Sequence, residues 1–288
     1  MKNVLIVGAN SFIGSAVRNW LMAKYPGRYV VTEIEAKDGK WKNANFAEFD
    51  VVFQVAGIAH VPKETPEMEE VFFSVNADMT EDIALAAKAA GVKQYVFMST
   101  KGVYPPFVTY IDENTKTGPV KLYGKSKLAG EQKILPLVSE DFKVAVLRCP
   151  SVYGAHAPGS YLQLLKKIDR LCVFPAYKNK RSMIYIDNLC EFIHLVIDRE
   201  LSGVLVPQDA EYMSTSDIVR VGAKIKGKRI LFDYLSWPLI AVLVKLTYKF
   251  RKPFGSTVYK RDFSMSDKEY YVCNFEDAVR RTIEEEQL

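Results

Sequence analysis

The sequence contains few of the side chains from which metal sites and disulfide frameworks are built. Its three histidines lie far apart, without the spacing of metal ligands, so we expect no metal site. The four cysteines are scattered, no C-x-x-C pair occurs and no signal peptide is recognisable. These features predict reduced thiols and a cytoplasmic protein. The residues concerned are His60, His156 and His194, and Cys149, Cys172, Cys190 and Cys273.

Charge and apolar runs also exclude classes of protein. The net charge is +5 over 288 residues without any block of like charges, which argues against nucleic acid as a partner and suits a small anionic ligand. The apolar stretch 237–248 is too short to span a bilayer, so we expect no transmembrane segment. A packed helix is the main expectation there, and peripheral membrane contact is the alternative. The basic residues that would favour such contact are Lys245, Lys249, Arg251 and Lys252.

The N-terminal residues have the pattern of a dinucleotide-binding turn. Residues 4–7 form an apolar run typical of a buried parallel strand, and residues 8–14 begin and end with Gly8 and Gly14. Apolar residues at helical spacing continue to a stop at Pro26 and Gly27. A strand, a glycine turn and a helix let pyrophosphate bind the amides at the helix N-terminus. A purely structural turn is the alternative.

Residues 29–34 predict a second strand, and Glu33 lies at its end. An acidic residue there accepts hydrogen bonds from the adenosine ribose hydroxyls. This role favours NAD over NADP, because a carboxylate repels a 2′-phosphate. An exposed strand-end charge is the alternative reading of Glu33, and Lys37, Lys40 and Lys42 keep NADP open. The short polar segment up to residue 50 leaves little room for a further strand and helix, so this edge of the sheet is expected to be abbreviated.

Strands and helices alternate further along the chain. Strands are expected at residues 51–57, 95–99 and 144–148, with a helix before Gly91. This alternation predicts an α/β fold, a Rossmann-type doubly wound parallel sheet with its ligands at the carboxyl ends of the strands. Gly8, Ala56, Thr100 and Arg148 all fall there.

Beyond Gly154 the pattern loosens into a small mixed α/β substrate lobe. Helices are expected near 160–171, 187–199 and 215–226, and short strands near 183–186 and 204–207. We therefore divide the chain into a dinucleotide-binding domain at 1–155, to which 181–200 returns, and a substrate-binding lobe at 156–288.

Tyr123 and Lys127 carry the most specific chemical signal. Their spacing of four places both side chains on one helix face. A nearby ammonium would lower the tyrosine pKa and make the phenol a general acid or base. Thr100, at the end of the 95–99 strand, could hydrogen-bond the same substrate oxygen. Taken alone, a Tyr-x-x-x-Lys pair is more often a solvated pair than a catalytic one.

The landmarks in register resemble the extended short-chain dehydrogenase/reductase superfamily, and within it the NAD-dependent epimerase/dehydratase family and its nucleotide-sugar 4-epimerase and 4-ketoreductase branch. The likeness covers nearly the whole chain. It rests on residues 8–14, 53–57, 75–76, 99–104, 123–127, 147–154 and 181–187.

The resemblance implies a role for each landmark. Tyr123 would be the catalytic acid/base, Lys127 would lower its pKa and hold the nicotinamide ribose, and Thr100 would replace the family's catalytic serine or threonine. Asn76 would lie near the nicotinamide, or cap the following helix. Arg181 would bind the substrate diphosphate, with a surface salt bridge as the alternative. The remaining positions are Gly8, Ser11, Phe12, Ile13 and Gly14 around the pyrophosphate, Ala56 and Gly57 beside the cofactor, and Ser151 at the substrate.

Three substitutions depart from the family pattern. Ser11 stands where the second glycine of the fingerprint is usual, Ser151 stands where many 4-epimerases carry asparagine, and Pro105 follows Tyr104 where glycine is usual. The short segment after Glu33 also lacks the Gly-Asp pair that would contact the adenine. Lys101 follows Thr100, where 4,6-dehydratases carry an acidic residue, so the resemblance disfavours dehydration.

The chemistry implied is hydride transfer at C4 of a UDP-hexose or related nucleotide sugar, with NAD or NADP as cofactor, in surface polysaccharide synthesis. A 4-epimerase, as for UDP-glucose, and a 4-keto reductase would use the same residues. A non-catalytic NAD(P)-binding redox sensor of the same fold is the alternative from another class. The family also implies a homodimer through the Tyr123 helix and the helix before it.

Overall fold

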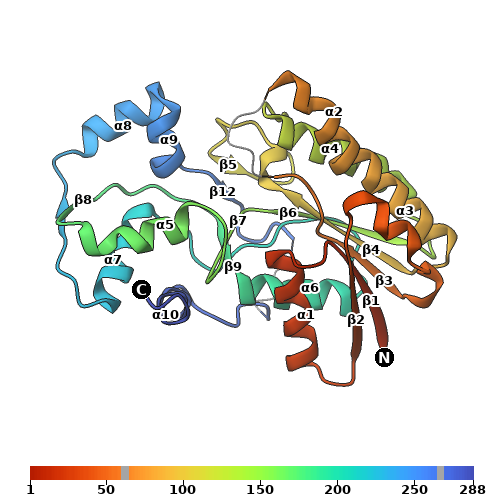
Figure 1. Ribbon diagram of the computed structural model, residues 1–288. Helices are drawn as coiled ribbons and strands as arrows, with labels where there is room; N and C mark the ends of the chain where they lie inside the picture. Colours follow the sequence, from red (N-terminus) through yellow and green to blue (C-terminus); the bar gives the residue numbers. More distant parts are fainter. Residues whose placement is uncertain (60–64, 265–268) are drawn as a thin grey trace.

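The core of the computed structural model is a six-stranded sheet in which every strand runs parallel to its neighbours (Figure 1). The structure describes residues 1–59, 65–264 and 269–288, so His60 lies outside it, as does the side chain of Lys249. The strand order is β10-β6-β4-β3-β1-β2. The doubly wound parallel sheet predicted from the sequence is confirmed. Its strands are β1 (Lys2–Val7), β2 (Tyr29–Ile34), β3 (Val51–Gln54), β4 (Gln94–Thr100), β6 (Lys143–Cys149) and β10 (Gly203–Leu205).

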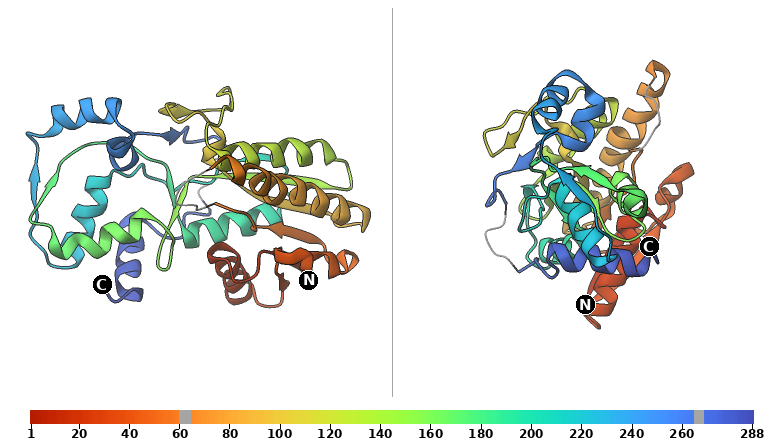
Figure 2. Two further views of the ribbon diagram at one scale, coloured as in Figure 1. Left: turned by 45° about the horizontal axis from the view of Figure 1, so that its top comes forward. Right: turned by 90° about the vertical axis from the view of Figure 1, so that its left-hand side faces the viewer.

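Helices cover both faces because successive strand side chains point to opposite sides. Val4 and Ile6 belong to the core that also contains α1 (Phe12–Lys24) and α6 (Ile186–Asp198). Leu5 and Val7 belong to a second core, which contains residues of α3 (Met79–Ala89) and α4 (Leu122–Ile134). In the left view of Figure 2, α3 and α4 lie on one side of the sheet and α1 on the other.

The edge beside β2 is abbreviated, as predicted. Only short 3-10 turns, Lys37–Asn43 and Phe46–Glu48, connect β2 to β3. The buried Trp41 and Phe46 anchor these turns to the sheet. β2 therefore remains the edge strand, and the chain crosses directly to β3 on the other side of β1.

The carboxyl-terminal part forms a smaller mixed lobe, at the left of Figure 1. Short strand pairs join β8 to β11, β7 to β9 and β5 to β12. β10 corrects the predicted division, because residues 203–205 pair with β6 and extend the large sheet. The helices are α5 (Ser160–Lys167), α7 (Thr215–Ile225), α8 (Trp237–Leu246), α9 (Tyr248–Phe254) and α10 (Phe275–Glu285), and the strands are β5 (Tyr110–Ile111), β7 (Ser151–Tyr153), β8 (Val173–Pro175), β9 (Met183–Tyr185), β11 (Leu231–Asp233) and β12 (Val258–Tyr259).

The stretch expected as one packed helix at 237–248 is divided. α8 ends before Thr247, whose extended backbone (φ −132°, ψ 136°) breaks the helix before α9 begins. Within the described part of the chain, no helix has the length and apolar content needed to cross a bilayer.

Candidate active site

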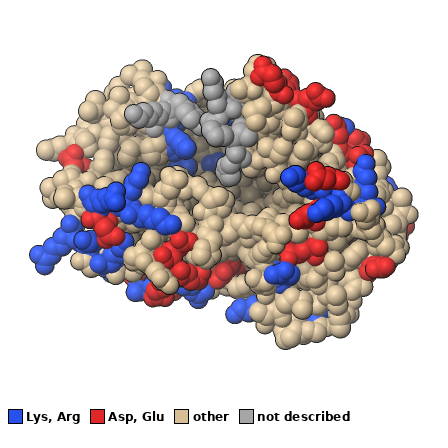
Figure 3. Space-filling view, in the orientation of Figure 1, with Lys and Arg blue, Asp and Glu red and all other residues tan. Residues whose placement is uncertain are grey.

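Three of the predicted site residues follow adjacent strands at one edge of the sheet. Gly8 follows β1, Ala56 lies two residues beyond β3, and Thr100 ends β4. The chain passes from β1 to β2 on one side of β1 and then crosses to β3 on its other side, and a crevice opens at this edge where the strand order reverses. Figure 3 shows a hollow in the centre of this face of the molecule, with Lys or Arg side chains at its upper left.

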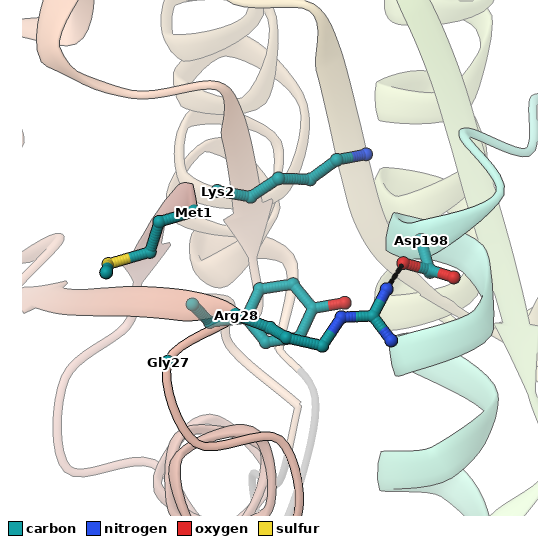
Figure 4. A pocket seen from close by; sticks show the side chains of 6 residues that line it. Met1, Lys2, Gly27, Arg28 and Asp198 are labelled. Carbon is teal, nitrogen blue, oxygen red and sulfur yellow. Dashed lines mark hydrogen bonds and ion pairs between the residues drawn. The ribbon is translucent and has the colours of Figure 1, made fainter.

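A second hollow, of about 240 Å³, lies at the opposite edge of the sheet (Figure 4). It is formed where β1 and β2 begin, and Arg28 reaches across it to pair with Asp198 at the end of α6. Parallel α/β sheets bind their ligands at the carboxyl ends of the strands. This hollow is therefore not the expected ligand site. It lies where α6 is attached to the sheet.

The turn after β1 requires glycine at its first position. Gly8 has φ +128°, and a Cβ there would lie 2.8 Å from the amide nitrogen of Ala56. Substitution would thus push β1 and the loop after β3 apart. The missing side chain keeps backbone exposed at the point where a dinucleotide pyrophosphate would approach.

Ser11 acts on the helix rather than only on a ligand. It is the N-cap of α1, and its Oγ accepts a hydrogen bond from the Gly14 amide at 3.1 Å. The Phe12 and Ile13 side chains pack against the main core, so these residues would serve a pyrophosphate through their amides. The Ser11 hydroxyl keeps its own proton for donation. The serine that departs from the glycine pattern is therefore compatible with an anion at this helix end.

Glu33 has one carboxylate oxygen paired and one unpaired. Its Oε2 forms an ion pair with Arg18 on α1. Its Oε1 is buried and has no hydrogen-bond partner among the described residues. The side chain is only 8% exposed, so the reading of Glu33 as an exposed strand-end charge is wrong. An orphaned buried acceptor fits the hydroxyl donors of a ribose.

Tyr123 and Thr100 meet at the start of α4. The Thr100 hydroxyl lies close enough to the phenol to lower its pKa, and Thr100 Oγ1 accepts a hydrogen bond from the Gly102 amide at 3.0 Å. The approach depends on Gly124, because a Cβ there would lie 2.2 Å from the Gly102 carbonyl oxygen. The Tyr-Gly-Lys-Ser-Lys sequence thus lets the helix bring its tyrosine onto the end of β4.

The pKa of Tyr123 corrects the expectation from the sequence. Burial raises it to about 12, and the hydrogen bond from Thr100 offsets only part of that rise. Lys127 is not among the groups that shift it. The prediction that Lys127 lowers the pKa of Tyr123 is therefore wrong for the protein chain itself. The phenol keeps its proton at neutral pH.

Lys127 is buried rather than solvated. Its Nζ donates a hydrogen bond to the Met98 carbonyl at 3.0 Å and lies 4.5 Å from the centre of the Phe97 ring. Burial lowers its pKa to about 7, although Glu131 opposes the shift. A buried lysine next to the loop after β3, with a pKa near 7, is typical of a functional site and not of a solvated surface charge.

Asn76 is a positioning residue for that loop. Its Oδ1 accepts from the Ile58 amide at 2.9 Å, and its Nδ2 donates to the Ile58 carbonyl and to Ser126 Oγ. It lies inside a π-helical turn, Ser74–Asp78, and is not a helix cap, so the capping alternative is wrong. A Cβ on Gly57 would lie 2.7 Å from Asn76 Oδ1 and 2.9 Å from Lys127 Nζ. Both side chains therefore meet the backbone at Gly57.

Arg148 contributes to the framework of the site. Although Arg148 is the second-last residue of β6, at the ligand edge, its guanidinium binds Glu131 on α4 through an ion pair of 2.7 Å and donates to the Tyr104 hydroxyl at 2.8 Å. Ser99 also hydrogen-bonds Glu131. These contacts fix α4 to β4 and β6. The ion pair with Glu131 neutralises the charge of Arg148.

Lys101 and Arg181 form a pair of cations without an anion. Both are half-buried, and no ion pair joins either of them to a described residue. Burial and the charge of Arg181 lower the pKa of Lys101 to about 8. The salt-bridge alternative for Arg181 is therefore wrong within the described chain. Lys101 was missed as a site residue, although its position next to Thr100 was the available signal.

Ser151 is exposed at the start of β7, where its backbone pairs with Met183 on β9. Arg181 precedes β9 by two residues, and its backbone exchanges hydrogen bonds with Met213. The two predicted substrate residues thus lie on neighbouring segments, Ser151 at the start of β7 and Arg181 just before its partner strand β9.

Comparisons with known proteins agree with this geometry. The model of the NAD dependent epimerase/dehydratase family matches residues 4–205. The chain is 25% identical over 255 residues to the N-acetyl-alpha-D-glucosaminyl-diphospho-ditrans,octacis-undecaprenol 4-epimerase of Escherichia coli O157:H7, covering 82% of this chain and 76% of that protein. It is 25% identical over 266 residues to UDP-glucose 4-epimerase of Vibrio cholerae, covering 83% and 78%.

Solved structures share the fold at lower identity. UDP-glucuronic acid 4-epimerase from Bacillus cereus, in complex with NAD, superposes with a TM-score of 0.73 at 18% identity, over 99% of this chain and 98% of that one. The dTDP-4-dehydrorhamnose reductase from Bacillus anthracis, in complex with NADP, superposes with a TM-score of 0.71 at 17% identity, over 99% of each chain.

Proposed function

Because the chain belongs to the NAD-dependent epimerase/dehydratase family of extended short-chain dehydrogenases/reductases, we propose that it acts at C4 of a UDP-hexose in surface polysaccharide synthesis. The reaction is either 4-epimerisation or reduction of a 4-keto sugar. The observation that carries the proposal is the proximity of the Thr100 hydroxyl to that of Tyr123, on the helix that also carries the buried Lys127.

The cofactor is a nicotinamide dinucleotide, with NAD slightly favoured. The turn at Gly8 and the N-terminus of α1 would hold its pyrophosphate, and the unpaired Glu33 oxygen would accept from the adenosine ribose. The Glu33 carboxylate would repel a 2′-phosphate. Of the lysines that would accommodate NADP, Lys40 pairs with Glu35. When bound, the dinucleotide supplies the hydride acceptor and donor.

Tyr123 holds the proton that moves at the C4 oxygen. With its pKa near 12 it is a phenol at neutral pH, so it is prepared to donate that proton to a carbonyl oxygen. Thr100 would hydrogen-bond the same oxygen and keep it in line with the phenol. The Lys127 ammonium would hold the nicotinamide ribose hydroxyls beside Asn76 and Gly57, where the two side chains already converge.

Lys101 and Arg181 suit the diphosphate of the substrate. The charge of Arg181 disfavours the charged form of the partly buried Lys101, and a bound anion would relieve that repulsion. Arg181 offers bidentate geometry for a phosphate, and Lys101 extends the positive charge towards Thr100. Ser151 lies on the neighbouring strand with its side chain exposed to a ligand.

A sugar linked through diphosphate to a polyprenol is a second candidate substrate. The name of the Escherichia coli relative specifies such a lipid-linked sugar. The observation that favours it here is the exposed apolar surface of α8, in the same lobe as Arg181. Both candidates share a sugar diphosphate, so the same two cations would serve either.

The proposed reaction is tested with Tyr123→Phe. We expect turnover of a UDP-hexose to fall by about 10²–10⁴-fold while cofactor affinity is kept, because only the phenolic hydroxyl is removed. Tyr110→Phe, at an exposed tyrosine on β5, is the matched control. Unchanged turnover in Tyr123→Phe would refute the role of the phenol, and no turnover in the wild type with intact cofactor binding would favour the redox-sensor alternative.

Nucleotide released from the purified protein distinguishes the two reactions. Recovered NAD in near-stoichiometric amount indicates a 4-epimerase, since epimerisation returns the hydride and recycles the cofactor. An empty protein that binds NADH or NADPH in titration indicates a single-pass 4-keto reductase. Failure to carry or bind any of these nucleotides contradicts the proposal.

A further inference from the structure

One face of α8 and the turn before it exposes a continuous stripe of large aliphatic side chains. Leu235 is 92% exposed, Leu239 62%, Val242 53% and Leu246 73%. Their spacing of three and four residues aligns them on one side of the helix. We call this set the α8 stripe. Only Ile240 in this helix is buried, so the opposite side attaches it to the lobe.

Most of the charge near the stripe is positive. Residues 234–259 contain four Lys or Arg and no Asp or Glu. Asp233, just before this range, accepts a hydrogen bond from the Leu235 amide at 2.8 Å. Lys245 lies on α8 next to Leu246, and Lys252 lies on α9; both are exposed. In Figure 3 the upper left of the molecule, where Figure 1 places α8, is almost free of charged side chains. An apolar face with a predominantly cationic flank complements an anionic surface.

The composition fits a lipid surface better than a protein. Tyr234 and Trp237, at the start of the stripe, are 63% and 50% exposed, and such amphipathic rings prefer the headgroup region of a bilayer. The stripe itself is Leu and Val, which are under-represented among the residues that dominate protein interfaces. Aliphatic, aromatic and lysine side chains on one short helix are typical of segments that lie in the membrane interface.

Arg251 connects this face to the catalytic loop. Its guanidinium donates to the Val244 and Lys245 carbonyls at the end of α8, at 3.2 and 3.0 Å. It also lies 4.3 Å from the ring centre of Phe107, an exposed residue in the loop that follows Thr100–Tyr104. The position of α8 is therefore coupled to a loop of the active site.

The chain after α9 leads to the proposed diphosphate site. Thr257 donates its amide to the Lys180 carbonyl at 3.0 Å and accepts from the Ser182 amide at 3.1 Å. These two bonds hold the backbone on either side of Arg181. The helices that carry the stripe are thus continuous with the segment that presents this cation.

From this arrangement we propose that the α8 stripe docks the protein on an anionic lipid bilayer, with the leucines in the interface and Lys245 and Lys252 against the headgroups. The docking is peripheral. It would hold the active site close to the membrane, where lipid-linked sugars and the enzymes that use them are found.

Vesicle co-sedimentation of the full chain without substrate tests the docking. We expect binding to vesicles of phosphatidylcholine mixed with phosphatidylglycerol, and much weaker binding to phosphatidylcholine alone. Leu239→Ser/Leu246→Ser should bind the anionic vesicles at least about tenfold more weakly, because each leucine loses most of its burial in the interface. Lys245→Glu/Lys252→Glu should remove the preference for anionic lipid.

The matched control is Met22→Ser/Val138→Ser, which removes two similarly exposed apolar side chains outside the lobe. It should bind as the wild type does. The docking is overturned if the wild type binds neither kind of vesicle, or if the leucine variant binds as well as the control. A leucine variant that instead converts a dimer to a monomer in light scattering identifies the stripe as an interface between copies.

Turnover of a soluble nucleotide sugar separates this inference from the proposed function. The leucine variant should keep wild-type kcat, because the stripe holds no residue of the reaction. Loss of vesicle binding with full turnover supports docking, and docking without any turnover leaves the membrane surface established while the proposed function fails.

Discussion

Lys127→Met is expected to stabilise the protein while it abolishes turnover. The Lys127 side chain is 3% exposed, and its only described hydrogen bond is to the Met98 carbonyl. Burial disfavours its charged form and lowers its pKa to about 7. Methionine has a similar length without the charge, so the variant removes a destabilising group and the proposed cofactor ligand together.

The magnitude follows from the pKa. A fall from 10.5 to about 7 means that the charged lysine destabilises the folded protein by about 5 kcal/mol at 1.36 kcal/mol per unit. Losing the hydrogen bond to the Met98 carbonyl offsets about 1–3 kcal/mol of the gain. We therefore expect the variant to unfold with a free energy about 2–4 kcal/mol higher than the wild type at pH 6.

The pH dependence has a definite sign. In the unfolded chain Lys127 has its ordinary pKa of 10.5, so between pH 7 and 10.5 the unfolded state binds one more proton than the folded state. The wild type then gains stability relative to the variant as the pH rises, by up to about 1.4 kcal/mol per pH unit. Below pH 7 both states are protonated, and the advantage of the variant is constant.

Urea unfolding of both proteins at pH 6, 7, 8 and 9 measures this difference, and the subtraction cancels titrations that they share. Lys125→Met, at an exposed lysine of the same helix, is the matched control and should show little effect at any pH. A Lys127→Met protein less stable than the wild type at pH 6, or a difference that does not shrink as the pH rises, would refute the account of Lys127 as a buried charge.

Three further predictions concern the site and the assembly. Gly124→Ala should lower kcat by about 10–100-fold, because its Cβ would lie 2.2 Å from the Gly102 carbonyl oxygen and displace Tyr123. Gly102→Ala is the control, since its Cβ would come no closer than 3.4 Å to its neighbours. Equal kcat values in the two variants would contradict this prediction. Glu33→Gln should weaken NAD and relatively favour NADP in binding titrations, whereas Glu140→Gln at an exposed site should change neither. Size-exclusion chromatography with light scattering should show a homodimer through α3 and α4, and a monomer at all concentrations would rule it out.

The sheet was predictable because its strands are buried on both faces and therefore read as continuous apolar runs. The limits of the strands were less predictable. β3 was expected to reach Gly57 but ends at Gln54, because the Val55 and Ala56 amides both donate to the Val7 carbonyl. That three-centre arrangement turns the chain away from the ladder, and no local sequence signal reports it.

The site residues were predictable in type but not in environment. A tyrosine and a lysine four apart predict one helix face, yet the shift in each pKa depends on how deeply the helix is packed. Arg148 illustrates the same limit, because its partner Glu131 lies on another element and only the tertiary structure brings the two together. Lys101 was visible beside Thr100, but its significance depends on Arg181, which is 80 residues further along the chain.

The stretch at 237–248 shows why an apolar run cannot be interpreted by hydropathy alone. Its length excludes a membrane span, but its residues are apolar on both sides of the helix, so periodicity cannot tell a packed face from a free one. The structure distinguishes them, since Ile240 is buried at 5% exposure while Leu246 on the other side is 73% exposed. If the helix only filled the lobe, leucine would not be needed at positions 239 and 246, because polar side chains at these exposed positions would leave the packing of the lobe unchanged. The free face, with Lys245 beside it and no acidic residue between positions 234 and 259, therefore requires an explanation outside the lobe, and the proposed anionic bilayer would supply both the apolar and the charged partner.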